Sequence, residues 1–184
     1  MSVRIKNLDM ENKIQIFDNF LEKKDFNNLK QFMLSGESDF QWYFSPDKVT
    51  DGDGIPQFCH VFYENCNVNT DKFQFIEPLV KKIDPLAIVR IKSNITMKTS
   101  AILTSPLHHD SNPNTFDNRD NITLDNQRTG VFYLNTNNGY TYFESGERVD
   151  SVENRLLVFP SSKRHAGTTN TDVDYRCVIN LNWF

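Results

Sequence analysis

Two histidines and one aspartate in this chain have the residue types and order of a metal-ligand set. His108 and Asp110 stand two positions apart, and His165 follows after several predicted strands. Residues i and i+2 of a strand face the same side, so His108 and Asp110 can bind one ion while His109 points away. Two imidazoles and a carboxylate form the facial triad that holds non-haem Fe(II) with open positions. The residues therefore predict a metal centre that can accept further ligands.

An arginine downstream of the third ligand adds a second chemical element. Arg176 follows His165 on a predicted strand, where a guanidinium can bind a carboxylate through two parallel hydrogen bonds. A His-x-Asp tripeptide alone occurs by chance, so the combination carries the prediction. Zinc hydrolases can also use two histidines and an aspartate, although they do not require the arginine. On the residues alone, both kinds of metal site remain open.

The elements expected to position these residues are two helices followed by many short strands. In the strand predicted over 86–97, polar and apolar residues alternate; the polar ones are Arg90, Lys92, Asn94 and Thr96. One face of this strand therefore meets a core, and the other meets solvent or a polar cavity. The turn 137–139 favours a hairpin between its flanking strands. Strands are predicted over 14–17, 40–44, 58–63, 86–97, 131–134, 140–143, 155–159 and 175–183, and helices over 26–33 and 73–83.

This order of elements predicts an α+β protein that is mainly β, with a sandwich or barrel in its second half. The length favours a single domain over residues 1–184. Residues 111–129 are rich in Asn and Asp and follow the predicted ligands directly. We expect a lid or a substrate-contacting loop there, with a disordered insertion as the alternative.

Composition limits the partners and the compartment. The formal net charge of −4 argues against a general nucleic-acid or anionic-membrane binder. No apolar run approaches the ~20 residues of a membrane span. Three cysteines, Cys59, Cys66 and Cys177, lack the spacing of a metal site and are expected to be free thiols in a reducing cytosol. We therefore predict a cytoplasmic protein with no membrane or nucleic-acid partner.

A set of segments between Arg90 and Phe184 stands in one recognisable order. In sequence they are His108-His109-Asp110, Phe132-Tyr133-Leu134-Asn135, residues 139–143, residues 154–159, His165-Ala166-Gly167 and Arg176. With these segments the chain resembles the 2-oxoglutarate/Fe(II)-dependent dioxygenase superfamily, on its prolyl-4-hydroxylase-like side. Asn138 stands where many relatives have a second glycine, and Val178 stands where some subfamilies have a hydroxyl group. These departures leave the subfamily and the substrate open.

The resemblance implies a double-stranded β-helix, or jelly roll, with supporting N-terminal helices. It implies that the triad binds iron and that Arg176 binds the distal carboxylate of 2-oxoglutarate. Tyr133 and Asn94 are further candidates for contacts with this co-substrate.

The implied activity uses Fe(II), 2-oxoglutarate and O₂, with ascorbate as an accessory reductant, to hydroxylate a C–H bond. A prolyl or other peptide side chain is the first substrate class, and a small molecule such as an amino acid or metabolite is the second. The alternative without catalysis is a metal-binding jelly-roll module.

Overall fold

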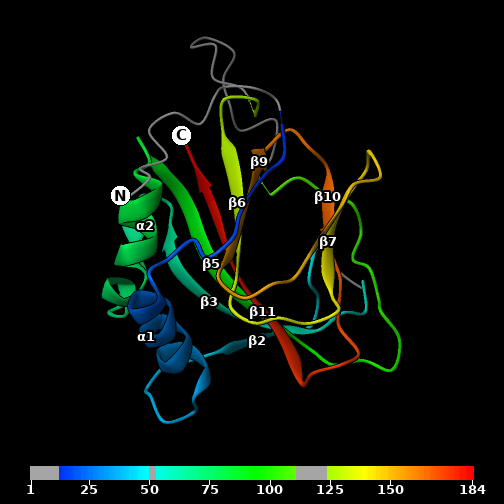
Figure 1. Ribbon diagram of the computed structural model, residues 1–184, viewed down its shortest axis with the longest axis horizontal. Coiled ribbons are helices and arrows are strands. Elements are labelled where there is room, and N and C mark those ends of the chain that lie inside the picture. Colours follow the sequence, from blue (N-terminus) through cyan, green and yellow to red (C-terminus); the bar gives the residue numbers. More distant parts are fainter. Residues whose placement is uncertain (1–12, 50–52, 111–123) are drawn as a thin grey trace.

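The computed structural model describes residues 13–49, 53–110 and 124–184 (Figure 1). Its helices are α1 (Lys23–Leu34), the short 3₁₀ helix η1 (Phe73–Phe75) and α2 (Glu77–Ile83). Its strands are β1 (Gln15–Phe17), β2 (Tyr43–Ser45), β3 (Gln57–Glu64), β4 (Asn67–Val68), β5 (Ile88–Met97), β6 (Arg128–Tyr133), β7 (Tyr140–Phe143), β8 (Arg148–Asp150), β9 (Arg155–Pro160), β10 (His165–Gly167) and β11 (Tyr175–Trp183).

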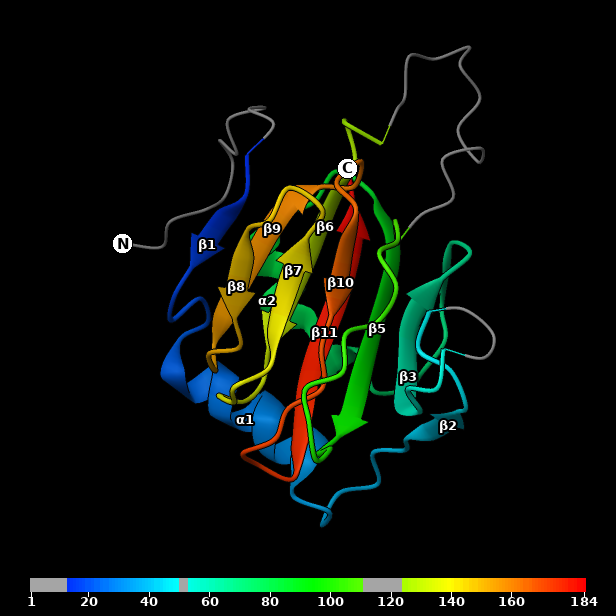
Figure 2. The ribbon, with the colours of Figure 1, turned by 90° about the vertical axis from the view of Figure 1, so that its right-hand side faces the viewer.

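The strands form two antiparallel sheets that face each other. The larger follows the order β1-β9-β6-β11-β5-β3-β2, with β4 added beside β3, and the smaller follows β10-β7-β8. Figure 2 shows the small sheet in front of β9, β6 and β11, and Figure 1 shows both helices on the opposite side of the large sheet. This arrangement confirms the predicted mainly-β jelly roll with supporting N-terminal helices.

The main hydrophobic core lies between the helices and the large sheet. Helix α1 contributes Phe26, Leu29 and Met33, whose spacing places them on one helical face. Alternate residues of β11 complete this core from the sheet side, among them Ile179 and Leu181. The intervening residues of β11 consequently face the small sheet, because successive side chains of a strand point to opposite faces.

A second, smaller apolar cluster fills part of the space between the two sheets. It joins Val131 and Tyr133 of β6 to Phe143 of β7 and Phe159 of β9. The polar faces of β5 and β11 lie beside this cluster and are not covered by the helices. The polar alternation predicted for β5 therefore lines the space between the sheets rather than an outer surface.

The predicted hairpin across residues 137–139 is wrong. Strand β7 pairs with β10 and β8, whereas β6 pairs with β9 and β11. The Asn137 side chain accepts a hydrogen bond of 2.9 Å from the Gly139 amide, and the Asn138 amide donates to Asp172 at 3.0 Å. These contacts stabilise a crossover from the large sheet to the small one, so an Asn-Gly turn joins strands of different sheets.

Several predicted boundaries also shift. Strand β2 starts at Tyr43, three residues after the predicted start, and the predicted second helix is divided at Ile76 into η1 and α2. Strand β6 starts at Arg128, so the last two residues of the predicted 111–129 loop belong to the large sheet. Residues 111–123 of that loop lie outside the described residues. Among the described residues, no helix has the length and apolar character needed to cross a membrane.

Candidate metal centre

The three predicted ligands meet between the two sheets. Nε2 of His108 lies 3.5 Å from Asp110 Oδ1, and Nε2 of His165 lies 3.7 Å from the same oxygen. Ligand atoms of all three residues fall within 4.8 Å of one another. Three ligands each about 2.1 Å from one ion stand roughly 3–4 Å apart, so the spacing suits a single bound metal.

Backbone pairing holds the two histidines side by side. The His108 amide donates to the His165 carbonyl at 2.9 Å, and the His165 amide donates to the His108 carbonyl at 3.0 Å. His108 lies in an isolated bridge and Asp110 in a bend, so the expected strand through both residues is absent. The bridge to β10 and the bend, rather than the alternation of a strand, direct their side chains to one point.

Hydrogen bonds at the other ring nitrogens orient both imidazoles. Nδ1 of His108 lies 3.0 Å from the Pro106 carbonyl oxygen, and Nδ1 of His165 lies 3.4 Å from the Lys163 carbonyl oxygen. A carbonyl oxygen accepts a hydrogen bond from Nδ1–H, so the proton stays on Nδ1 and Nε2 keeps the lone pair that binds a metal. Burial lowers the pKa of His165 and favours this neutral form. His109 stands outside the set, with Nδ1 3.2 Å from the Ser161 carbonyl oxygen.

The Asp110 side chain is 4% exposed and is kept in its anionic form. Burial by itself raises its pKa, but the adjacent His108, His165 and Arg90 outweigh burial and lower the pKa well below its ordinary value. The Asn182 side-chain amide donates to Asp110 Oδ2 at 3.2 Å. Because one oxygen is held by Asn182, the other is directed toward the two imidazoles. Asn182 lies on β11, far from Asp110 in the sequence, so their contact depends on the fold.

A cavity of about 350 Å³ opens beside the triad, within the size range of small-molecule sites. The triad and Arg176 face this same space, together with cations on the wall. Its lining includes Lys48, Gln57, Arg90, Lys92, Asn94, Thr96, His109, Val131, Thr141, Gly167, Val178 and Asn180.

Arg176 is a buried cation held by neutral partners. Its side chain is 4% exposed, and its Nε donates to Ser151 Oγ at 2.9 Å. Nη2 lies 3.4 Å from Thr141 Oγ1, and the guanidinium carbon lies 5.5 Å from the centre of the Tyr133 ring. Within the described part of the chain, no ion pair joins Arg176 to a carboxylate. A buried guanidinium without an acidic partner is suited to bind an anionic ligand.

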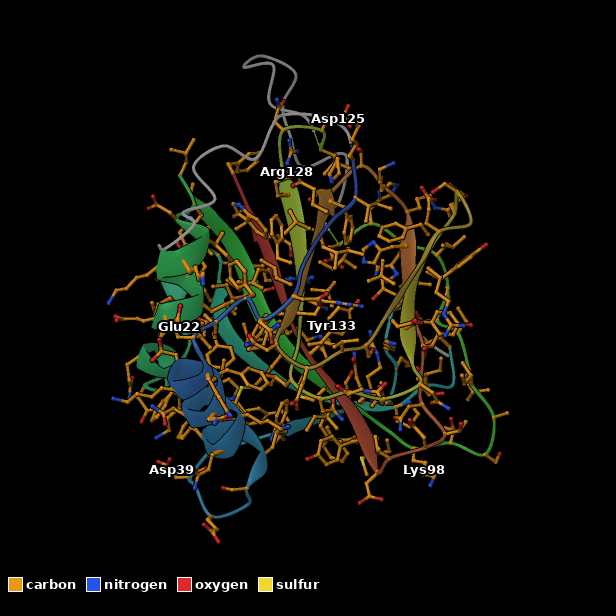
Figure 3. The ribbon with its side chains drawn as sticks, in the orientation of Figure 1. Glu22, Asp39, Lys98, Asp125, Arg128 and Tyr133 are labelled. Carbon is orange, nitrogen blue, oxygen red and sulfur yellow. The ribbon has the colours of Figure 1, made fainter. Side chains whose placement is uncertain are left out.

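Tyr133 and Asn94, the two further candidates for contacts with the co-substrate, occupy different positions. Tyr133 is fully buried between the sheets (Figure 3), where its hydroxyl contacts Thr141 Oγ1 at 2.8 Å and its ring lies beneath Arg176. It therefore supports the residues that face the cavity rather than lining it. Asn94 does line the cavity, and its side-chain oxygen accepts a hydrogen bond of 3.3 Å from the Cys59 thiol.

Three cations of the cavity wall were not predicted as site residues. Arg90 and Lys92 lie on the polar face of β5, so strand alternation had already grouped them with Asn94. Lys48 lies in the loop after β2, where the sequence has no periodicity that would indicate the direction of its side chain. These cations make the cavity positive in a chain whose net charge is −4.

Comparison with solved structures identifies the architecture. The chain is similar to a prolyl hydroxylase from Trichoplax adhaerens, solved with a peptide fragment of hypoxia inducible factor, at 15% identity and a TM-score of 0.68, covering 98% of this chain and 87% of that one. It is similar to a 2OG-Fe(II) oxygenase family oxidoreductase from Burkholderia pseudomallei at 11% identity and a TM-score of 0.63, covering 92% and 84%. The chain has the fold of the 2OG-Fe(II) oxygenases.

The same fold extends to a protein acting in small-molecule biosynthesis. The non-heme alpha ketoglutarate dependent epimerase SnoN, from nogalamycin biosynthesis, matches at 11% identity and a TM-score of 0.58, covering 94% of this chain and 78% of that one. No protein-family profile matches the sequence. No curated protein sequence matches it either. The likeness to solved structures therefore establishes the fold, and the site residues must support the function.

Proposed function

We propose that this protein is an Fe(II)- and 2-oxoglutarate-dependent dioxygenase that hydroxylates a C–H bond. The observation that carries the proposal is that two different groups face one cavity. One is the cluster of His108, Asp110 and His165, and the other is Arg176, a buried cation with no carboxylate partner among the described residues. A metal would bind the cluster, and a dicarboxylate bound to that metal through one end would place its other carboxylate at Arg176.

The residues suit the proposed cofactors in type and orientation. Both histidines present Nε2 and Asp110 presents a carboxylate oxygen, a donor set suited to Fe(II). Iron bound here with 2-oxoglutarate and O₂ supplies the oxidising power for hydroxylation. The protein holds three ligand atoms, keeps the other coordination positions open and binds the co-substrate's distal carboxylate at Arg176. Ascorbate, as a reductant that maintains Fe(II), completes the proposed set.

The first substrate class is a prolyl or other peptide side chain, and the second is a small molecule. The Trichoplax adhaerens neighbour with its bound peptide fragment supports the first, and the epimerase of nogalamycin biosynthesis supports the second. A zinc hydrolase would use the same three ligands but leaves Arg176 without a role. A non-catalytic metal-binding module would likewise leave the buried guanidinium unexplained.

Anaerobic titration of the protein with Fe(II) and 2-oxoglutarate tests the proposal. We expect a weak visible charge-transfer band from the chelate and, after O₂ is admitted, formation of succinate. Asp110→Ala and His165→Ala should remove both signals, because each deletes one of three ligands. His60→Asn is the matched control, since His60 is buried outside the cavity against Gln41 and Thr70. Zn-dependent hydrolysis without a band in the native protein would contradict the proposal.

We further propose a single domain over residues 1–184 and a cytoplasmic location. The two sheets support the single domain, since the larger sheet combines strands from both halves of the chain. The three free cysteines support the cytoplasmic location, because thiols persist in a reducing compartment. Cys59 and Cys177 are buried and Cys66 is exposed. Fractionation of cells expressing the tagged full chain, alongside cytosolic and secreted marker proteins, tests the location. Recovery with the secreted marker would contradict it.

A further inference from the structure

Lys48 is a lysine that the metal site does not use. Its side chain lines the cavity, and its Nζ is inaccessible to solvent and has no hydrogen-bond partner among the described residues. Lys48 as a whole is half-buried, so other atoms of the residue reach solvent while its ammonium does not. A buried ammonium without a partner reduces stability. Its position on the cavity wall therefore suits a residue that binds an anion.

The Lys48 ammonium and the Arg176 guanidinium border the same small space. A methyl group placed on Gly167 would lie 2.9 Å from Lys48 Nζ and 3.6 Å from Arg176 Nη1. The absence of a side chain at Gly167 leaves room for both cations. Their mutual repulsion contributes, after burial, to lowering the pKa of Lys48 to about 7. An anion bound at Arg176 Nη1 would lie beside the Lys48 ammonium.

The loop after β2 is built to direct Lys48 inward. The Asp53 carboxylate accepts hydrogen bonds from the backbone amides of Lys48 at 3.1 Å, Val49 at 2.7 Å and Ile55 at 3.0 Å. Gln57, buried on β3, donates to the Asp47 and Lys48 carbonyl oxygens at 3.3 and 3.1 Å. Because both the amide and the carbonyl of Lys48 are held, the direction of its side chain is set by the loop backbone.

Arg176 alone offers an incomplete site for a carboxylate. Of its five N–H donors, the one on Nε and one on Nη2 already contact Ser151 and Thr141, which leaves the two donors of Nη1 and one of Nη2 for a ligand. A carboxylate has two oxygens with about four acceptor positions. The ammonium of Lys48 can donate to an acceptor position that these three donors leave unfilled.

We propose that Lys48 is a second binding residue for the distal carboxylate of the 2-oxo diacid, acting together with Arg176 beside Gly167. This inference rests on the proposed function and adds a determinant of co-substrate selectivity to it. The two cations would favour a diacid over a 2-oxo monoacid of the same chain length, because only the diacid brings a charge to this position. Removing Lys48 should reduce that preference and leave the metal ligands in place.

Binding calorimetry on the full chain loaded with Mn(II), which replaces iron without oxidation chemistry, tests the inference. The two probes are 2-oxoglutarate and 2-oxopentanoate, which has the same five carbons without the distal carboxylate. We expect Lys48→Met to weaken 2-oxoglutarate binding by about 10- to 100-fold, the range for a lost charge-assisted hydrogen bond. Binding of 2-oxopentanoate should stay within about twofold. Lys24→Met, on the exposed face of α1, is the matched control and should leave the affinity for both oxo acids unchanged.

The two probes separate a binding role from a structural one. A distorted cavity would weaken both compounds together, so a parallel loss in Lys48→Met overturns the inference. Unchanged 2-oxoglutarate binding in that variant also overturns it, while leaving the proposed function intact. If the native protein binds Mn(II) but neither oxo acid, the proposed function fails and the inference with it. Mn(II) affinity, measured on each variant, reports that the fold and the triad are preserved.

Discussion

Replacing Lys48 by Met should stabilise the free protein, although the same change weakens co-substrate binding. Burial, followed by the neighbouring Arg176, lowers the pKa of Lys48 from 10.5 to about 7. A lowering of the pKa by this amount corresponds to a cost on the order of 5 kcal/mol in folding free energy when Lys48 is buried in its charged form. Water in the adjoining cavity offsets part of it, so we expect a gain of about 1–3 kcal/mol. Met keeps the unbranched stem and removes the charge.

The free energy of unfolding that Lys48→Met gains should depend on pH in a defined direction. The folded-state pKa of Lys48 lies below its unfolded value of about 10.4, so between pH 7 and 10 the unfolded chain binds more protons than the folded one. The penalty is therefore complete below pH 7 and declines as pH rises toward 10. Besides Lys48, the charged groups that set this window are Arg176, which lowers the pKa, and Asp53, which raises it.

Thermal unfolding of the metal-free protein at a series of pH values measures the effect. A gain of 1–3 kcal/mol corresponds to an increase in Tm of about 2–12 °C for a chain of this size. Saturating Mn(II) and 2-oxoglutarate should narrow the difference, because the native protein gains more from the ligand than the variant does. Lys24→Met supplies the baseline for removing an exposed lysine. A Lys48→Met variant that is less stable than the native protein at pH 7, or equally stable at every pH, would refute the reasoning.

Three further substitutions test other parts of the structure. Asn182→Ala removes the amide that holds Asp110 Oδ2 and should weaken metal binding by about 10- to 100-fold in a titration, with little change in Tm; unchanged metal affinity would count against this positioning role. Gly139→Ala places a methyl group 2.8 Å from Arg176 Cδ and from the Thr169 carbonyl oxygen, so it should cost about 1–3 kcal/mol in denaturant unfolding and weaken 2-oxoglutarate binding; native stability would contradict the close approach. Leu29→Ala, in the core between α1 and the large sheet, should cost about 2–5 kcal/mol while the remaining folded protein keeps its metal affinity; a loss of metal affinity in that folded fraction would show that the core and the site are coupled.

Much of the architecture follows from local patterns in the sequence. The alternation over 175–183 predicts β11 with its observed bounds, and the helical spacing of Phe26, Leu29 and Met33 predicts the buried face of α1. Such periodicities depend on neighbours within one element, so they can be read without knowing the fold. The residue types and order of the triad and Arg176 likewise indicated a metal and an anion site before any contact was known.

Contacts between distant segments depended on the pairing of strands. The turn at 137–139 has a hairpin signal, yet its chain crosses to the other sheet, because β6 finds its partners in β9 and β11. His108 and Asp110 converge through a bridge to β10 and a bend, an arrangement that strand alternation did not predict. The polar face of β5 fits solvent and a cavity equally well until the small sheet is placed opposite it.

The amino-acid sequence by itself determined which residues could bind a metal and an anion, and which faces of the long strands are polar. Only the tertiary structure decided that these groups share one cavity and that Lys48 joins them from a separate loop. The physical reason is that residue type and local periodicity are properties of neighbouring positions. The approach of Lys48, Gly167 and Arg176 instead requires three segments to be packed together, and no local pattern records that packing.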